Sequence, residues 1–536
     1  MAASRFDGIH RLLLFTVLIL FFVASSPVLC KQLKCSSEHS KQPKQSSSLR
    51  GKSSTSLVSV CRTSACTEVG KSLYQAIDFC ADPCEDFYAF SCGNWATLHP
   101  VSSSEEEENA SSGSSTFSLM VSEVDALLKK LLLSTSTKSS KSKAVALAKD
   151  LYRECLDVEA RKKIHFSPLQ KEFADITGYE WPISQEQAKL VDEASAAATD
   201  YKEALMKALI RFIQIEKSPV VDLFIDQDIN DTTTSIFYFS VPEGFDKDKI
   251  IYLNEERYQM QISYYVREML ALTKEVHGLK AEETDTAELE ITSRIWEFEL
   301  ALVNASTPIE LVMEDPKEGY NRMSLKEFED ATGNEFSWSA LVKLFVQQFN
   351  LQAEKITADT QVIVGDVEYF RRLPKILAET PLHVVYNYLG MRLFYTFRNQ
   401  SDTPIEEQCL AVVTAKFDQA VSRLYVDEHV TPGVTKQQAA KLIADIRASF
   451  RRVIQKGAKW LDEKTRAKVL EKESATKFES VFPDWLLDDS LLDAHYGLDE
   501  NKNLSVKTSH FLETMLDIRR HRMVTFSRKM GYTIKE

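Results

Sequence analysis

The stretch that decides the fold runs from residue 82 to residue 95 and reads DPCEDFYAFSCGNW. Its two cysteines, Cys84 and Cys92, lie eight residues apart around an acidic turn and a run of aromatic residues. Upstream, Cys61 and Cys66 lie five residues apart, and Cys66 precedes Cys84 by eighteen. This arrangement predicts covalent cross-links beside a small hydrophobic plug, at the start of the globular part of the chain.

The spacing of these motifs resembles the opening of the ectodomain in the neprilysin family of zinc metalloendopeptidases. The matching elements are C-x4-C at 61–66, DPC-x-DFY at 82–88 and CG-x-W at 92–95. The similarity continues through WEFELA at 296–301 and WLDEKTR at 460–466, and it covers nearly everything from Cys61 to Met530. A generic cysteine cluster of a secreted protein is the alternative, because short motifs also match by chance.

Composition predicts a mainly α protein that does not bind nucleic acid. Of the 536 residues, 44% are hydrophobic and 27% are charged, which is typical of globular proteins. The net charge of -13 makes the surface acidic, so it repels phosphate backbones. Only 16 residues are glycine, and long stretches are rich in the helix formers Ala, Leu, Glu and Lys. Together with the resemblance, this predicts a multi-helix bundle ectodomain with a small β-hairpin.

Hydrophobic periodicity locates the main elements. A leucine stripe from 117 to 132 and a second apolar face from 144 to 160 predict helices whose stripes form core. Long helices are also expected at 255–276, 285–304, 338–350 and 508–530. Strands are expected at 220–225 and 235–240, with Asn230 in their connection.

The N-terminal region predicts passage into the secretory pathway. Residues 1–11 form a short cytosolic tail, 12–29 an apolar run, 30–60 a Ser- and Lys-rich stalk, and 61–536 the helical cap domain. The apolar run is intermediate in length between a signal peptide and a membrane anchor. We expect a single-pass plasma-membrane protein with an extracellular C-terminus, and a secreted protein is the alternative. Cys30 and Cys35 are candidates for an intermolecular disulfide.

Nine cysteines without a Cys-x-x-Cys pair favour disulfides, and five N-glycosylation sequons point to the same compartment. We expect this chain to be a glycoprotein. The sequons begin at Asn109, Asn230, Asn304, Asn399 and Asn503.

The resemblance implies specific roles for the cysteines. The counterparts of Cys155 and Cys409 pair with each other, and Cys61 and Cys66 are also expected to be disulfide-bonded. The counterparts of Cys84 and Cys92 pair with cysteines of the catalytic half, whereas the last cysteine here is Cys409. We therefore expect unpaired thiols at Cys84 and Cys92. Cys80 is a further unpaired candidate, and a local bond from it to either thiol is the alternative.

The chemistry of the family is not matched in this sequence. Zinc peptidases of this kind use two histidines four residues apart on a helix, with a glutamate as base. Among the ten histidines, no two are separated by four. His429 follows two acidic residues at an expected helix end, and His510 and His521 lie near three arginines, so neither set predicts a metal site. We therefore expect no catalytic or metal-binding residue and no cofactor in this chain, with zinc only in a catalytic domain that is absent from it.

Three hypotheses follow. The first is an inactive N-terminal, substrate-gating region of a neprilysin-like peptidase that acts on short extracellular peptides. The second is a non-catalytic ectodomain that binds peptides or a protein. The third is a membrane-tethered structural protein. In the first case the cap would expose apolar surface, which predicts self-association.

Overall fold

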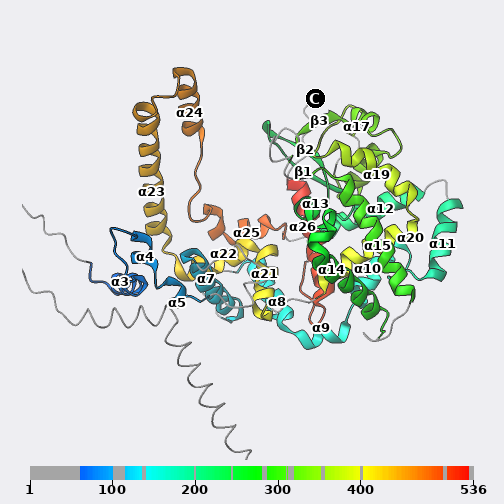
Figure 1. The fold of residues 1–536 in the computed structure, drawn as a ribbon, viewed down its shortest axis with the longest axis horizontal. Coiled ribbons are helices and arrows are strands. Elements are labelled where there is room, and N and C mark those ends of the chain that lie inside the picture. Colours follow the sequence, from blue (N-terminus) through cyan, green and yellow to red (C-terminus); the bar gives the residue numbers. More distant parts are fainter. Residues whose placement is uncertain are drawn as a thin grey trace, which may run out of the picture. The chain divides into compact units, whose positions relative to one another are not determined.

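The structure is a computed structural model that describes residues 61–100, 115–135, 141–197, 201–242, 245–279, 286–308, 311, 319–351, 356–398, 403–498 and 504–529. The chain divides into two compact units, Met1–Val124 and Asp125–Glu536. The sequence had indicated one domain from residue 61 onward. Figure 1 shows the ribbon with its elements labelled.

The described residues of the smaller unit up to His99 form three short helices, which are held by capping and cross-links. They are α3 (Ser64–Ala76), α4 (Phe87–Cys92) and α5 (Trp95–Leu98), and the following helix α7 (Thr116–Leu133) contains the division between the units. Asp86 caps α4 by accepting a hydrogen bond from the Ala89 amide at 2.8 Å. The amide of Asp78 donates to the carbonyl of Phe90 at 2.8 Å, which ties the turn after α3 to α4.

The larger unit is mainly helical. Its helices are α8 (Lys143–Leu156), α9 (Val158–Ile164), α10 (Ser167–Thr177), α11 (Gln185–Ala197), α12 (Tyr201–Gln214), α13 (Phe245–Leu253), α14 (Glu255–Val276), α15 (Thr286–Ala305), α17 (Leu325–Ala331), α18 (Trp338–Gln348), α19 (Val367–Glu379), α20 (Leu382–Phe397), α21 (Ile405–Lys416), α22 (Asp418–His429), α23 (Pro432–Arg452), the π-helix η2 (Val453–Gly457), α24 (Glu463–Ala475), the 3-10 helix η3 (Asp484–Leu487), α25 (Asp489–His495) and α26 (Phe511–Lys529).

A four-stranded sheet is built into this unit in the order β1-β2-β4-β3. The hairpin of β1 (Asp222–Asp228) and β2 (Asp231–Ser240) is antiparallel, β2 pairs in parallel with β4 (Gln361–Val364), and β4 is antiparallel to β3 (Asn321–Ser324). The predicted hairpin is therefore confirmed, but it belongs to a larger sheet.

Aromatic side chains join the sheet to the helices. Phe239 of β2 lies within 5.0–5.8 Å, between ring centroids, of Phe328, Trp338 and Phe370. All four side chains are buried, and they belong to one continuous apolar core. The burial of so much aromatic surface supplies the main driving force for this part of the fold.

Trp181 packs against α20 and fixes it to this core through hydrogen bonds. Its indole nitrogen donates to the carbonyl of Asn387 at 2.9 Å, while the Asn387 side chain accepts from the Ile183 amide at 2.8 Å. A Cβ atom added to Gly390 would lie 2.1 Å from the Trp181 ring. Position 390 therefore requires glycine, because the indole occupies the space of any side chain there.

Helix ends are capped by residues from distant parts of the chain. Asp493 of α25 accepts hydrogen bonds from the Ser142 hydroxyl at 2.5 Å and from the Lys143 and Ala144 amides at 3.0 Å, at the start of α8. The Tyr496 hydroxyl donates to Asp418 at 2.9 Å and accepts from the Gln419 amide at 2.8 Å, at the start of α22. These contacts fix the C-terminal helices onto the middle of the chain.

Helices α23 and α24, joined through η2, form a two-helix arm (Figure 1). Arg447 and Arg451 of α23 each reach Glu473 of α24 at 2.7 Å. The guanidinium of Arg466 donates to the carbonyls of Ala458 at 3.0 Å and Leu461 at 2.9 Å, which closes the turn after η2. Polar contacts thus hold the arm together.

The mainly α fold is confirmed, and several expected helices agree closely with the structure, such as α14 at Glu255–Val276. The stripe of the helix at 117–132 was predicted as core, but only Leu128 and Leu132 of α7 are buried among its described residues, and Val121 is 57% exposed. In α8 the buried face agrees with prediction and includes Leu147, Leu151 and Tyr152.

Candidate functional site

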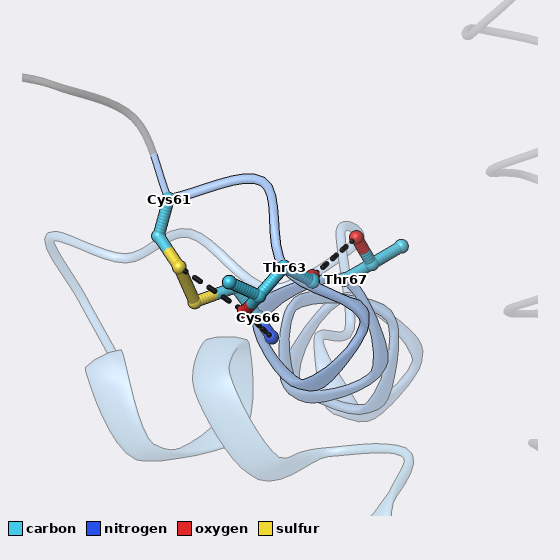
Figure 2. Close-up of a disulfide and its surroundings, with 4 residues drawn as sticks. All are labelled: Cys61, Thr63, Cys66 and Thr67. Carbon is cyan, nitrogen blue, oxygen red and sulfur yellow. Dashed lines mark hydrogen bonds between the residues drawn. A yellow bond between two sulfur atoms is a disulfide. The ribbon is translucent and has the colours of Figure 1, made fainter.

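The first candidate site is the cysteine-rich start of the smaller unit. Cys61 and Cys66 form a disulfide with Cα atoms 6.0 Å apart, at the N-terminus of α3. Figure 2 shows how Thr63 supports it: the Thr63 hydroxyl accepts from the Cys66 amide at 3.3 Å, and the Thr67 hydroxyl donates to the Thr63 carbonyl at 3.0 Å. The disulfide therefore lies at a helix N-terminus that is also capped by hydrogen bonds.

Cys84 and Cys92 carry free thiols in the structure. Cys84 is exposed in a turn where its amide donates to Asp82 at 2.8 Å, and Cys92 ends α4, with its sulfur 3.5 Å from the Ser91 hydroxyl. Cys80 was expected to be unpaired, but it is disulfide-bonded. It is therefore not available to bridge Cys84 or Cys92.

The smaller unit also carries exposed aromatic side chains on α3 and α4. Phe87 and Tyr88 of α4 are 68% and 79% exposed, and Tyr74 of α3 is also exposed. Exposed aromatic surface of this kind is typical of a protein contact region.

In the larger unit, Cys155 of α8 and Cys409 of α21 form a buried disulfide with Cα atoms 5.6 Å apart. The Tyr152 hydroxyl donates to the Glu406 carbonyl at 3.3 Å beside it. The bond joins positions 254 residues apart, so its role is structural.

Of the five sequons, two lie in described parts of the structure. Asn230 is exposed in the β1–β2 turn, and Asn304 is exposed near the end of α15. Asn109, Asn399 and Asn503 lie outside the described residues, as do Cys30, Cys35 and the apolar run at 12–29. None of the helices in the described part of the chain is long and apolar enough to cross a bilayer.

The described residues do not assemble a zinc site. Nowhere among them do three or more His, Cys, Asp or Glu side chains cluster in a way that could hold a metal ion. His429 ends α22 on the surface, His510 is exposed, and the imidazole of His521 lies 2.7 Å from the Tyr496 carbonyl. These donors do not fit the tetrahedral site that zinc chemistry requires.

The larger unit contains a charged aromatic cavity that was not predicted from the sequence. It has a volume of about 340 Å³ and is lined by residues of α13, α14, α15 and α20, among them Tyr252, Tyr265, Trp296 and Arg392. Beneath it, the fully buried Glu299 accepts from the hydroxyls of Tyr252 at 2.8 Å and Tyr265 at 3.1 Å. The one indication of this cavity in the sequence is the spacing of Trp296 and Glu299, because residues three apart lie on one face of a helix.

The ionisation of this cluster follows from its burial. Desolvation, reinforced by the charge of Glu299, raises the pKa of Tyr252 and of Tyr265, so both phenols stay protonated and act as donors. Desolvation is the largest single influence and opposes the charge of Arg392, but Tyr388, Glu299, Tyr265 and Tyr252 together outweigh it, and the pKa of Arg392 is raised. The guanidinium therefore remains a cation.

A second, larger cavity of about 520 Å³ lies beside α11 and the start of α20. Its lining includes Asp192, Ser195, Leu205 and Thr380. A carboxylate oxygen of Asp192 accepts a hydrogen bond from the ring nitrogen Nδ1 of His383, 2.8 Å away. This pair joins α11 to α20 and is satisfied within the fold.

The larger unit is a set of helices around a small mixed sheet, and a disulfide begins the described part of the smaller unit. The sequence model described as Peptidase family M13 matches residues 83–483, and the chain belongs to this family. The predicted relationship to neprilysin-like zinc metalloendopeptidases is thereby confirmed.

Curated relatives agree with this assignment. Neprilysin-1 of Trittame loki is 24% identical over 465 residues, covering 82% of this chain and 60% of its own length. Neprilysin of Mus musculus is 25% identical over 473 residues, with the same two coverages. The chain thus spans about three fifths of the length of the curated relatives it matches.

Solved structures share the fold. PepO from Lactobacillus rhamnosis aligns with a TM-score of 0.64 at 15% identity, over 85% of this chain and 67% of that one. The zinc metalloprotease Zmp1 of Mycobacterium tuberculosis, in complex with an inhibitor, aligns with a TM-score of 0.60 at 17% identity, over 85% and 64%. At these identities the likeness concerns the fold alone.

Proposed function

We propose that this chain is the N-terminal, substrate-gating region of a neprilysin-like zinc metalloendopeptidase that acts on short extracellular peptides. The observation that carries the proposal is the extent of the family match, which runs over residues 83–483 and leaves about 40% of each relative's length without a counterpart. In this reading the helical cap admits short peptides and excludes folded proteins by size.

Hydrolysis would require residues beyond those described. Zinc in such enzymes lowers the pKa of a bound water, which then attacks the peptide carbonyl. Because the described residues offer no cluster of metal ligands, we derive no catalytic step from them. The proposed contribution of this chain is to enclose the substrate and to hold the catalytic part in place.

The free thiols and the arm are the proposed attachment points for that catalytic part. Cys84 is exposed, so its thiol is accessible to a cysteine of the catalytic part. On α23 the side chains of Leu442, Ile446, Phe450 and Val453 follow helical spacing and are 44–62% exposed. An apolar stripe of this length on one face is typical of a contact surface.

We also propose the cellular setting that the sequence predicts. The apolar run at 12–29 would anchor the chain in the plasma membrane with its C-terminus outside the cell, and cleavage there would give a secreted protein. Exposure of Asn230 and Asn304 supports their use as glycosylation sites. Treatment of the secreted or surface-exposed protein with a glycosidase should lower its mass, and variants Asn230→Gln and Asn304→Gln should each remove one step of that shift.

The test of the main proposal uses the full chain purified from a secretory host. With zinc chloride added, it should not cleave a fluorogenic peptide, and Cys84 and Cys92 should both react with iodoacetamide under native conditions, as read by peptide mass mapping. Chelator-sensitive cleavage by the intact chain would overturn the assignment of inactivity. Two thiols bridged within one copy would overturn the proposed attachment.

The alternative is a non-catalytic ectodomain that binds peptides or a protein, and the exposed stripe on α23 favours contact with a macromolecule. If the stripe is left uncovered in the isolated chain, it should drive self-association, which sedimentation velocity would show as a concentration-dependent increase in mass. The variant Leu442→Glu/Ile446→Glu should then be monomeric. The matched control Ala444→Glu/Ala448→Glu adds the same charge to exposed positions on another face of α23 and should associate like the wild type.

A further inference from the structure

The cavity bounded by α13, α14, α15 and α20 has an aromatic wall. Tyr252 and Trp296 are stacked, with ring centroids 5.3 Å apart and planes 15° apart. Tyr265 meets Trp296 and Tyr395 edge to face at 6.2 and 5.8 Å. The rings are therefore held in fixed orientations and form an apolar wall. The cavity that they line has a volume of about 340 Å³, within the usual range of small-molecule sites.

The charge that faces this cavity is positive. Glu299 is fully buried, and the hydroxyls of Tyr252 and Tyr265 occupy its oxygens at 2.8–3.1 Å. Arg392 lines the cavity with 29% of its side chain exposed. Its Nη1 lies 3.5 Å from the Tyr265 hydroxyl and 3.6 Å from Glu299, both longer than a strong charge-assisted hydrogen bond.

The guanidinium of Arg392 has further N–H groups that can donate hydrogen bonds to a ligand. A guanidinium carries five N–H groups in a planar fork, and the contacts among the described residues involve Nη1. A carboxylate can bind this fork through two parallel hydrogen bonds. A cationic ligand, which aromatic cages often bind, would meet the like charge of Arg392 instead.

We propose that this cavity binds a small molecule or chain terminus that combines an aromatic ring with a carboxylate. The ring packs against the Tyr252 and Trp296 wall, and the carboxylate pairs with Arg392. Gln261 of α14 lines the same cavity from an exposed position. The inference does not depend on the proposed peptidase role, because binding is measured on this chain alone.

The test measures binding of N-acetyl-L-tryptophan to the purified full chain by isothermal titration calorimetry. We expect saturable binding at one site per chain. N-acetyl-L-tryptophanamide has the same ring but lacks the carboxylate, so it should bind about tenfold more weakly, as expected for loss of a charge-assisted hydrogen bond. Absence of binding by the acid, or equal affinity for acid and amide, would overturn the proposal.

Variants locate the site without disturbing the buried network. Gln261→Trp places a bulky ring in the lining of the cavity and should weaken binding of N-acetyl-L-tryptophan by at least about tenfold. Ser263→Trp is the matched control, since Ser263 is exposed on the same helix and does not line the cavity. It should bind like the wild type. Equal affinities for the two variants would place the binding elsewhere and contradict the assignment.

Arg392 itself is tested in a folded background. Arg392→Gln removes the charge, and circular dichroism first establishes that the helical content is kept. The folded variant should bind the acid and the amide equally well, because the discrimination comes from the guanidinium. A folded Arg392→Gln protein that still prefers the acid would overturn the role of this residue.

Discussion

The two units of this chain reach order by different means. In the smaller unit, Ala76 is the buried side chain among the described residues of α3, α4 and α5, and aromatic residues such as Tyr88 are largely exposed. In the larger unit, Trp181, Trp338 and Tyr388 are fully enclosed in one apolar core. A unit with little buried surface depends on cross-links and caps, whereas a unit with a large core depends on close packing.

The largest expected effect tests the long cross-link of the larger unit. Cys155→Ala/Cys409→Ala opens a loop of 254 residues, and the loop-entropy relation predicts a loss of up to about 5 kcal/mol in the free energy of unfolding. Guanidinium denaturation followed by tryptophan fluorescence measures it.

The matched variant is Cys61→Ala/Cys66→Ala, whose loop spans 5 residues. The same relation predicts about 2 kcal/mol, confined to the smaller unit. If both double variants unfolded the core to the same extent, the distinction between the units would fail.

The next effect tests packing. Gly390→Ala forces a Cβ to within 2.1 Å of the Trp181 ring, and overpacking of this kind should cost about 3 kcal/mol. Gly433→Ala is the control, because no atom lies within 4 Å of its added Cβ, at the exposed start of α23. Thermal unfolding should separate them clearly. Similar melting temperatures would mean that the Trp181 contact is not tight.

A smaller effect is expected at the long-range cap. Asp493→Ala removes three hydrogen bonds at the start of α8 and should cost about 1–2 kcal/mol. Asp462→Ala removes a local cap, the 2.8 Å bond to the Thr465 amide, at the start of α24 in the arm. Hydrogen exchange should show faster exchange in α8 for the first variant and in α24 for the second. Loss of protection in α24 for both would contradict this separation.

The smallest effect concerns pH. His495 stacks on Trp485 with ring centroids 4.8 Å apart, and partial desolvation, aided by Lys529, lowers the pKa of His495 despite the opposing Asp418. Because the unfolded chain binds the proton more readily, stability should decrease as the pH falls below about 6.5. Comparison of urea midpoints at pH 7.5 and 5.5 measures this, and His495→Phe should reduce the difference. An unchanged difference would exclude His495 as its source.

Local patterns predicted the helices well and the sheet only in part. The bounds of α14 follow from periodicity alone, because a long amphipathic helix has many residues that agree. Strands β3 and β4 have four residues each, too few for an alternating pattern to stand out.

The candidate sites depended on contacts that sequence does not display. Cys80 was a candidate for an unpaired thiol because the family resemblance offers no counterpart for it, yet it is disulfide-bonded. Glu299 and Arg392 lie 93 positions apart, and their meeting over an aromatic cavity follows from the packing of α15 against α20. The resemblance named the family, but it did not indicate this cavity.

The cap that Asp493 places on α8 also sets an order of events during biosynthesis. The hydrogen bond from the Lys143 amide, in the first turn of α8, can form only after Asp493 has been synthesised, 350 positions later in the chain. At ribosomal speeds of about 5–20 residues per second, that delay is roughly 20–70 s. For that interval the start of α8 has only its local cap from Ser142, so the translation rate should influence how early this helix becomes stable.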